Sequence, residues 1–67
     1  MQLTRLASNC PDRSTCPTIY ATDRGTVVVQ GSTLLPAEVS QLGLPAGESA
    51  VEIPASLLEE AARARRD

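Results

Sequence analysis

The sequence predicts a small α+β protein: a small antiparallel sheet of three or four strands around a central β-hairpin, with a short middle helix and a C-terminal helix. Three observations favour this class. Two β-prone runs flank Asp23-Arg24-Gly25, Pro36 and Gly43 bracket a short helical segment, and the C-terminal segment is amphipathic. Sixty-seven residues are expected to make one small domain, whose core consists mainly of Leu, Val, Ile and Ala because Phe and Trp are absent.

Residues 18–31 predict the hairpin. Gly25 ends a three-residue loop, at the position where a type I turn with a G1 bulge needs a left-handed residue. This loop sets the register, with Ile19 opposite Val29 and Tyr20 opposite Val28. One face of the ribbon is then wholly apolar and is expected to be covered: Ile19, Ala21, Val27 and Val29.

The other elements follow from local signals. Residues 2–7 predict a first strand and residues 8–17 a Cys/Pro loop. A short helix is expected over 35–42, with Pro36 at its first position and Gly43 as its stop. A turn at 45–48 and a strand at 49–53 follow. We expect four residues of these strands to lie in the core: Val27, Val29, Val51 and Ile53.

The C-terminal helix is predicted over residues 54–66. Ser56 and Glu59 match a capping box, and a start with Pro54 as the first helical residue is the alternative. Acidic residues lie early and arginines late, as the helix dipole favours. The stripe expected to face the sheet consists of four residues: Leu57, Leu58, Ala61 and Ala62.

The amino-acid composition argues against several classes of function. The net charge is −2 and no basic residue occurs from Gly25 to Ala62, which argues against nucleic-acid binding. No early apolar run is long enough for a signal peptide or a membrane span, so a cytoplasmic protein without membrane contact is expected. The chain has no His and no Lys, and no Gly-rich phosphate loop. We therefore expect no enzyme activity and no cofactor.

Cys10 and Cys16 are the one candidate site with distinctive chemistry. Five residues separate them, a spacing that suits a disulfide or a pair of thiols with a local structural role. A redox-sensitive pair is the second interpretation. Metal binding is the third, with Asp12 or the cysteines of a second copy completing the ligands, since zinc needs four.

Three hairpin residues are candidate partner contacts: Tyr20, Arg24 and Val28. Tyr is frequent at interface hot spots, and an arginine on a rigid turn can bind anions. The competing interpretations are a solvated Arg24 and a Tyr20 that covers a minor core. A core with one aromatic residue and an unprotected strand edge also predicts a homodimer.

Two stretches carry a resemblance that covers nearly the whole chain: Cys16 to Gly31 (CPTIYATDRGTVVVQG) and Leu44 to Pro54 (LPAGESAVEIP). They resemble a family of small uncharacterised actinobacterial proteins, whose genes often lie beside helix-turn-helix regulators. The resemblance implies a regulatory accessory role, and it carries over no functional residue.

Residues 35–53 are similar to the strand end, short helix, turn and strand of AbrB-type swapped-hairpin transcription factors. The shared features are Pro36 before the helix, Leu42-Gly43, Gly47 followed by an acid, and an alternating strand. That family has basic residues along this segment and this chain has none. The resemblance therefore implies an intertwined dimer more than DNA binding.

Together, these observations predict a non-enzymatic protein-interaction module that is an accessory to a transcription regulator. One alternative is a small swapped-hairpin-type DNA-binding factor. The other is a thiol-based redox or metal sensor that uses Cys10 and Cys16.

Overall fold

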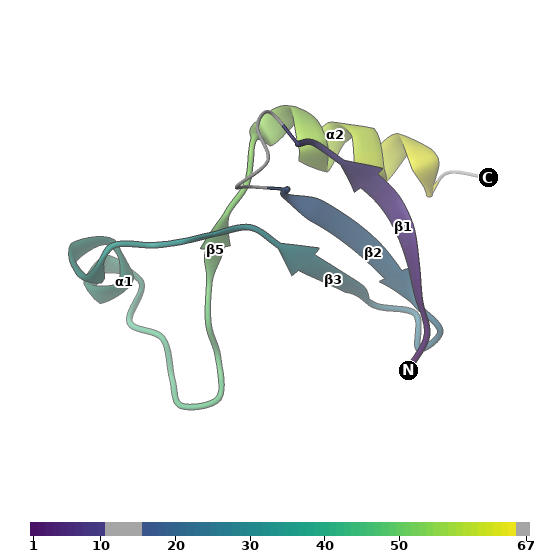
Figure 1. Cartoon of the computed structure of the whole chain (residues 1–67). Helices are drawn as coiled ribbons and strands as arrows, with labels where there is room; N and C mark the ends of the chain where they lie inside the picture. Colours follow the sequence, from purple (N-terminus) through teal and green to yellow (C-terminus); the bar gives the residue numbers. More distant parts are fainter. Residues whose placement is uncertain (11–15, 66–67) are drawn as a thin grey trace.

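The computed structural model describes residues 1–10 and 16–65 and has the predicted α+β class. Three strands, β1 (Leu3–Ser8), β2 (Thr18–Thr22) and β3 (Val27–Gln30), form an antiparallel sheet in the order β1-β2-β3. The helix α2 (Ala55–Ala64) lies across β1 and β2 (Figure 1). We refer to the sheet and α2 as the body.

The hairpin confirms the predicted register, with Ile19 opposite Val29 and Tyr20 opposite Val28. Gly25 has a φ of 80°, the left-handed conformation that the turn requires. Thr22 organises the turn: its hydroxyl oxygen accepts the N–H groups of Arg24 (3.1 Å) and Thr26 (3.2 Å). The turn chemistry is therefore local, which is why the sequence predicts it.

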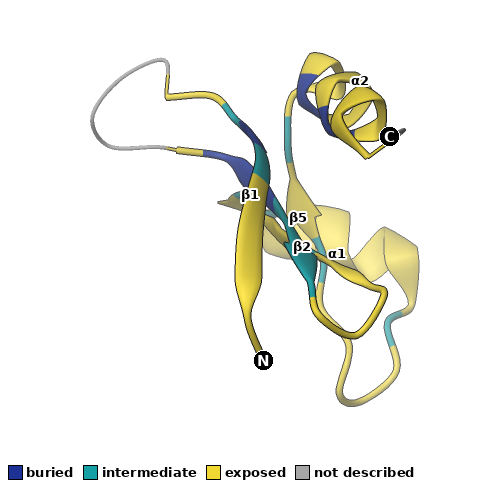
Figure 2. Ribbon diagram, turned by 90° about the vertical axis from the view of Figure 1, so that its right-hand side faces the viewer, coloured by how far each residue is buried: buried dark blue, intermediate teal, exposed yellow. Residues whose placement is uncertain are grey.

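The core is smaller than predicted and lies at one end of the sheet. Its buried apolar residues are Ala7 and Ile19 from the sheet and Leu57 and Ala61 from α2, with Leu6 and Ile53 packed against them (Figure 2). The expectation that Val27, Val29 and Val51 are core residues is wrong, because all three are exposed. The helix covers β1 and β2, so the apolar face of β3 extends beyond it.

The start of α2 also differs from the predicted one. Pro54 is the N-cap residue, the helix begins at Ala55, and no side chain caps it, so the Ser56–Glu59 capping box is wrong. Because the helix starts before Ser56, that serine lies inside the first turn and cannot cap it. Of the predicted inward stripe, Leu57 and Ala61 are buried, whereas Leu58 and Ala62 face solvent.

Residues 31–53 leave the sheet and form what we call the arm. It consists of β4 (Ser32–Thr33), α1 (Pro36–Leu42) and β5 (Val51–Glu52), and β4 and β5 pair as a separate two-stranded sheet. The predicted strand over 49–53 is thus only two residues long. The backbone of Gly31 passes so close to the Glu52 carbonyl that an added Cβ would lie 2.5 Å from its oxygen.

The middle helix α1 covers Pro36–Leu42 of the predicted range 35–42, and Leu35 is its N-cap residue. Pro36 is its first residue, and Gly43 ends it in the left-handed conformation with a φ of 60°. The Glu38 carboxylate accepts the N–H of Leu35 (3.0 Å), which satisfies one amide at the helix start. A turn follows at the predicted place, where the Glu48 N–H donates to the Pro45 carbonyl (3.2 Å).

Candidate functional site

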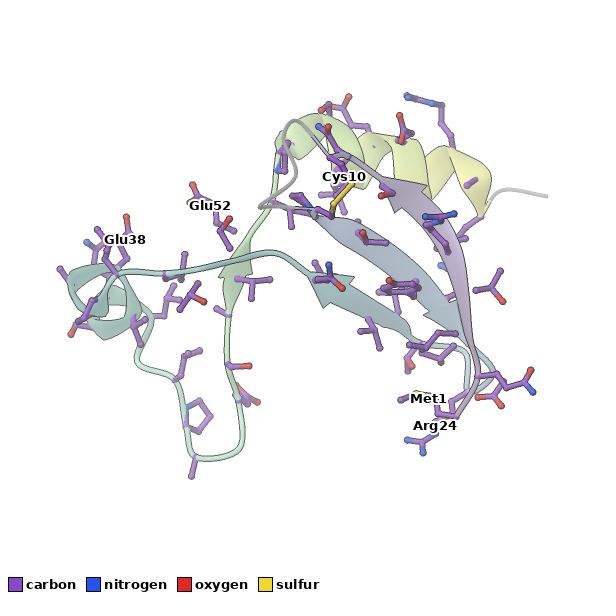
Figure 3. All side chains as sticks on the ribbon, in the orientation of Figure 1. Met1, Cys10, Arg24, Glu38 and Glu52 are labelled. Atoms are coloured by element: carbon purple, nitrogen blue, oxygen red, sulfur yellow. A yellow bond between two sulfur atoms is a disulfide. The ribbon has the colours of Figure 1, made fainter. Side chains whose placement is uncertain are left out.

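Cys10 and Cys16 form a disulfide that joins the end of β1 to the start of β2 (Figure 3). Their Cα atoms lie 4.3 Å apart and both residues are exposed. Neither residue is a free thiol in this state. Of the interpretations that the sequence leaves open, the pairing fits a local structural role, and a redox or metal-sensing function stays a prediction.

Hydrogen bonds hold the base of the disulfide loop. The Cys16 carbonyl accepts the Thr18 hydroxyl (2.9 Å) and the Gln30 side-chain amide (2.8 Å), and the Asn9 N–H donates to the Pro17 carbonyl (2.9 Å). The strand ends are therefore positioned by bonds that do not involve sulfur. Asp12, the carboxylate considered for a metal site, lies outside the described residues.

The three predicted partner-contact residues do not form one site. Tyr20 and Val28 are half-buried neighbours on the sheet face that points away from Ile19 and the core. Arg5 pairs with Tyr20 and so lies on the same face. Arg24 is exposed at the tip of the hairpin, at the far end of β2 and β3 (Figure 3).

Another apolar surface lies on the arm. Leu35, Val39 and Leu42 follow one another at i, i+4 and i+7, so they form a stripe along one side of α1. All three are exposed, and none of the seven residues of α1 is buried. We call these three residues the α1 stripe. The sequence pattern does not predict it, because a seven-residue helix gives only two turns of periodicity.

The charges are divided between the arm and the body. Between residues 31 and 53 the only charged residues are acidic: Glu38, Glu48 and Glu52. Glu38 and Glu52 project from α1 and β5 (Figure 3). The described arginines, Arg5, Arg24, Arg63 and Arg65, all belong to the body or its hairpin turn. The α1 stripe is therefore an apolar surface on an acidic segment.

Within residues 1–10 and 16–65, no group of three or more metal-ligating side chains lies together. No helix in this part of the chain has the length and hydrophobicity needed to cross a membrane. Comparison with protein-family models, curated proteins and solved structures found no match.

Proposed function

We propose that this chain is a non-enzymatic protein-interaction module that works as a homodimer and serves as an accessory to a transcription regulator. The α1 stripe is the observation on which the proposal depends. A helix of seven residues forms too few hydrogen bonds to be stable alone in water, and most helices are stabilised by packing. None of the residues of α1 is buried, so a partner that covers the stripe would supply the missing stabilisation.

The chemistry of the arm indicates which kind of partner would fit. Apolar anchors at i, i+4 and i+7 suit a hydrophobic groove on another protein. The three glutamates of the arm favour a groove with a basic rim. Regulators that bind DNA carry such basic surfaces. The resemblance to proteins encoded beside helix-turn-helix regulators supports the same choice.

A capture experiment tests whether the partner of the α1 stripe is a transcription regulator. The tagged protein is expressed in its native host, cross-linked in the cell and purified, and captured proteins are quantified by mass spectrometry. Val39→Glu places a charge in the α1 stripe, whereas Ala37→Glu adds the same charge to the opposite side of α1. We expect a helix-turn-helix regulator with the wild type and with Ala37→Glu, and at least about tenfold less with Val39→Glu. Equal recovery with all three proteins would contradict the proposal.

The exposure of the arm also supports the homodimer. The radius of gyration is 13.1 Å, whereas a compact domain of this length has about 11 Å. The arm projects from the body and is almost wholly exposed (Figures 1 and 2). Light scattering after size exclusion at tens of micromolar protein is expected to give the mass of two chains. A mass of one chain at every concentration would refute self-association.

A swapped-hairpin DNA-binding factor is the second candidate. The order of β4, α1, the turn at 45–48 and β5 in a projecting arm favours it. The charges oppose it, because phosphate contacts need cations and the arm has none. Salt-sensitive retardation of duplex DNA at micromolar protein would favour this candidate over the accessory role.

A further inference from the structure

The outer edge of β3 is the feature of the body that the proposed function leaves unexplained. β3 is the last strand of the sheet, and no strand in the described part of the chain pairs with its outer side. Natural edge strands are usually protected by Lys, Pro or an inward-pointing charge. The sequence of β3, Val-Val-Val-Gln, has none of these. Such an edge is suited to strand addition.

The direction of the peptide groups along β3 follows from the hairpin. The Thr22 N–H donates to the Thr26 carbonyl (2.9 Å), and bonded and non-bonded pairs alternate along an antiparallel ladder. In the register of the hairpin, Tyr20 and Val28 are therefore a bonded pair. Val27 and Val29 consequently direct their N–H and C=O groups outward, to the open edge.

The side chains of the same two residues are also incompletely covered. Val27 is 44 % and Val29 38 % exposed, because α2 packs on β1 and β2. An occupant of this edge must therefore provide two sets of peptide groups and an apolar surface beside them. It must also bring no charge opposite the three valines, because the edge offers none to pair with it.

We propose that the occupant is β3 of a second copy, paired antiparallel about a twofold axis at Val28. In this register Val27 lies opposite Val29 of the second copy, and the two exchange both peptide hydrogen bonds. Val28 lies opposite Val28 of the second copy as a non-bonded pair. Both faces of the junction are then apolar, and the two sheets join into one of six strands. The proposal rests on the proposed self-association and specifies its interface.

The antiparallel arrangement also brings the hairpin turn of each copy towards the start of the other copy's arm. This turn carries both Asp23 and Arg24, and the arm begins at Ser32, which is paired with Glu52 of its own chain. Of the two turn charges, Arg24 has the sign that favours contact with this acidic segment. Four strand residues alone make a smaller interface than most stable ones, and the turn and the arm enlarge it. The α1 stripe takes no part in this pairing.

Disulfide cross-linking tests the register. Cysteines form a disulfide when their Cα atoms lie about 4.4–6.8 Å apart, and a non-bonded antiparallel pair lies within this range at about 4.5 Å. Val28→Cys is therefore expected to give a covalent dimer on mild oxidation, and the peptide map should show the introduced sulfur of one copy joined to that of the other. Val27→Cys and Val29→Cys are the matched controls. Each alone is expected to cross-link at least about tenfold less, whereas a mixture of the two variants gives a cross-link between positions 27 and 29.

Two further outcomes separate the claims. If light scattering shows a dimer but Val28→Cys cross-links no faster than Val27→Cys, this register is wrong and self-association stands. If the wild type has the mass of one chain at all concentrations, the register and the self-association are both wrong, and a strand of a different protein becomes the occupant of the β3 edge. Val29→Lys places a charge at the junction and is expected to shift the mass to one chain, with an unchanged circular dichroism spectrum as the control for folding.

Discussion

Leu57 is the side chain on which the stability of the body depends most. It is 2 % exposed and is the largest fully buried side chain in the described structure. Its replacement by alanine removes buried methyl groups and leaves a cavity that a rigid sheet refills only in part. Such Leu→Ala changes lower the free energy of unfolding by about 2–5 kcal/mol, and we expect about 3 kcal/mol here.

The loss expected for Leu57→Ala is large relative to the total free energy of unfolding. A chain of this length has a total stability of about 3–10 kcal/mol at the usual 0.05–0.15 kcal/mol per residue. At the lower end of this range, Leu57→Ala is expected to unfold a measurable fraction of the protein in the absence of denaturant. Leu57→Val, which removes less volume, is expected to lower the stability by about 1 kcal/mol and keeps the transition measurable.

Leu58 provides the matched control. It is the same residue type at the next position of α2, but it is 61 % exposed. Leu58→Ala is expected to change the stability by no more than about 0.5 kcal/mol. Urea unfolding followed by circular dichroism measures all variants, at one fixed protein concentration because association stabilises the folded state. Equal effects of Leu57→Ala and Leu58→Ala would refute the placement of α2 on the sheet.

Four other predictions concern the loop, the turn, the arm and the charges. The double variant Cys10→Ser, Cys16→Ser is expected to keep the fold and to lower the free energy of unfolding by about 2 kcal/mol, measured by urea unfolding. Stoichiometric zinc bound to the wild-type protein in native mass spectrometry would contradict a local structural role of the two cysteines. Thr22→Val removes the acceptor of two turn amides and is expected to cost about 1 kcal/mol in the same assay. Gly31→Ala forces β4 and β5 apart, because the added Cβ would lie 2.7 Å from the Ile53 Cγ2 atom, and NMR shift changes are expected throughout the arm. Random duplex DNA is expected to show no retardation at micromolar protein and low salt, since the arm has no cation.

The sequence predicts this fold where the determining interactions are local. The hairpin depends on Gly25 and Thr22, and α1 depends on Pro36 and Gly43, all of which lie within a few residues of what they define. The composition of the core is different. Val27 is as apolar as Ile19 and shares its face, but only Ile19 lies under α2, and no local pattern specifies where a distant helix packs.

The candidate sites show the same division. The spacing of Cys10 and Cys16 is compatible with free thiols, a disulfide or a metal site, and the disulfide is seen only once β1 and β2 are placed side by side. The α1 stripe has a helical period, but the significance of Leu35, Val39 and Leu42 comes from their exposure. Exposure depends on the projection of the arm away from the body, which the sequence did not predict.

The packing of α2 on β1 and β2 has a consequence for synthesis on the ribosome. Ala7 and Ile19 are translated before Leu57 and Ala61, which complete their core. The sheet therefore lacks its packing partner until α2 (Ala55–Ala64) has been made, and the contacts between α2 and β1 join segments that are far apart in the sequence. Such contacts are slow to form and leave apolar strands exposed in the meantime. The nascent protein is thus expected to fold only after release of α2 from the exit tunnel, and to need protection from aggregation until then.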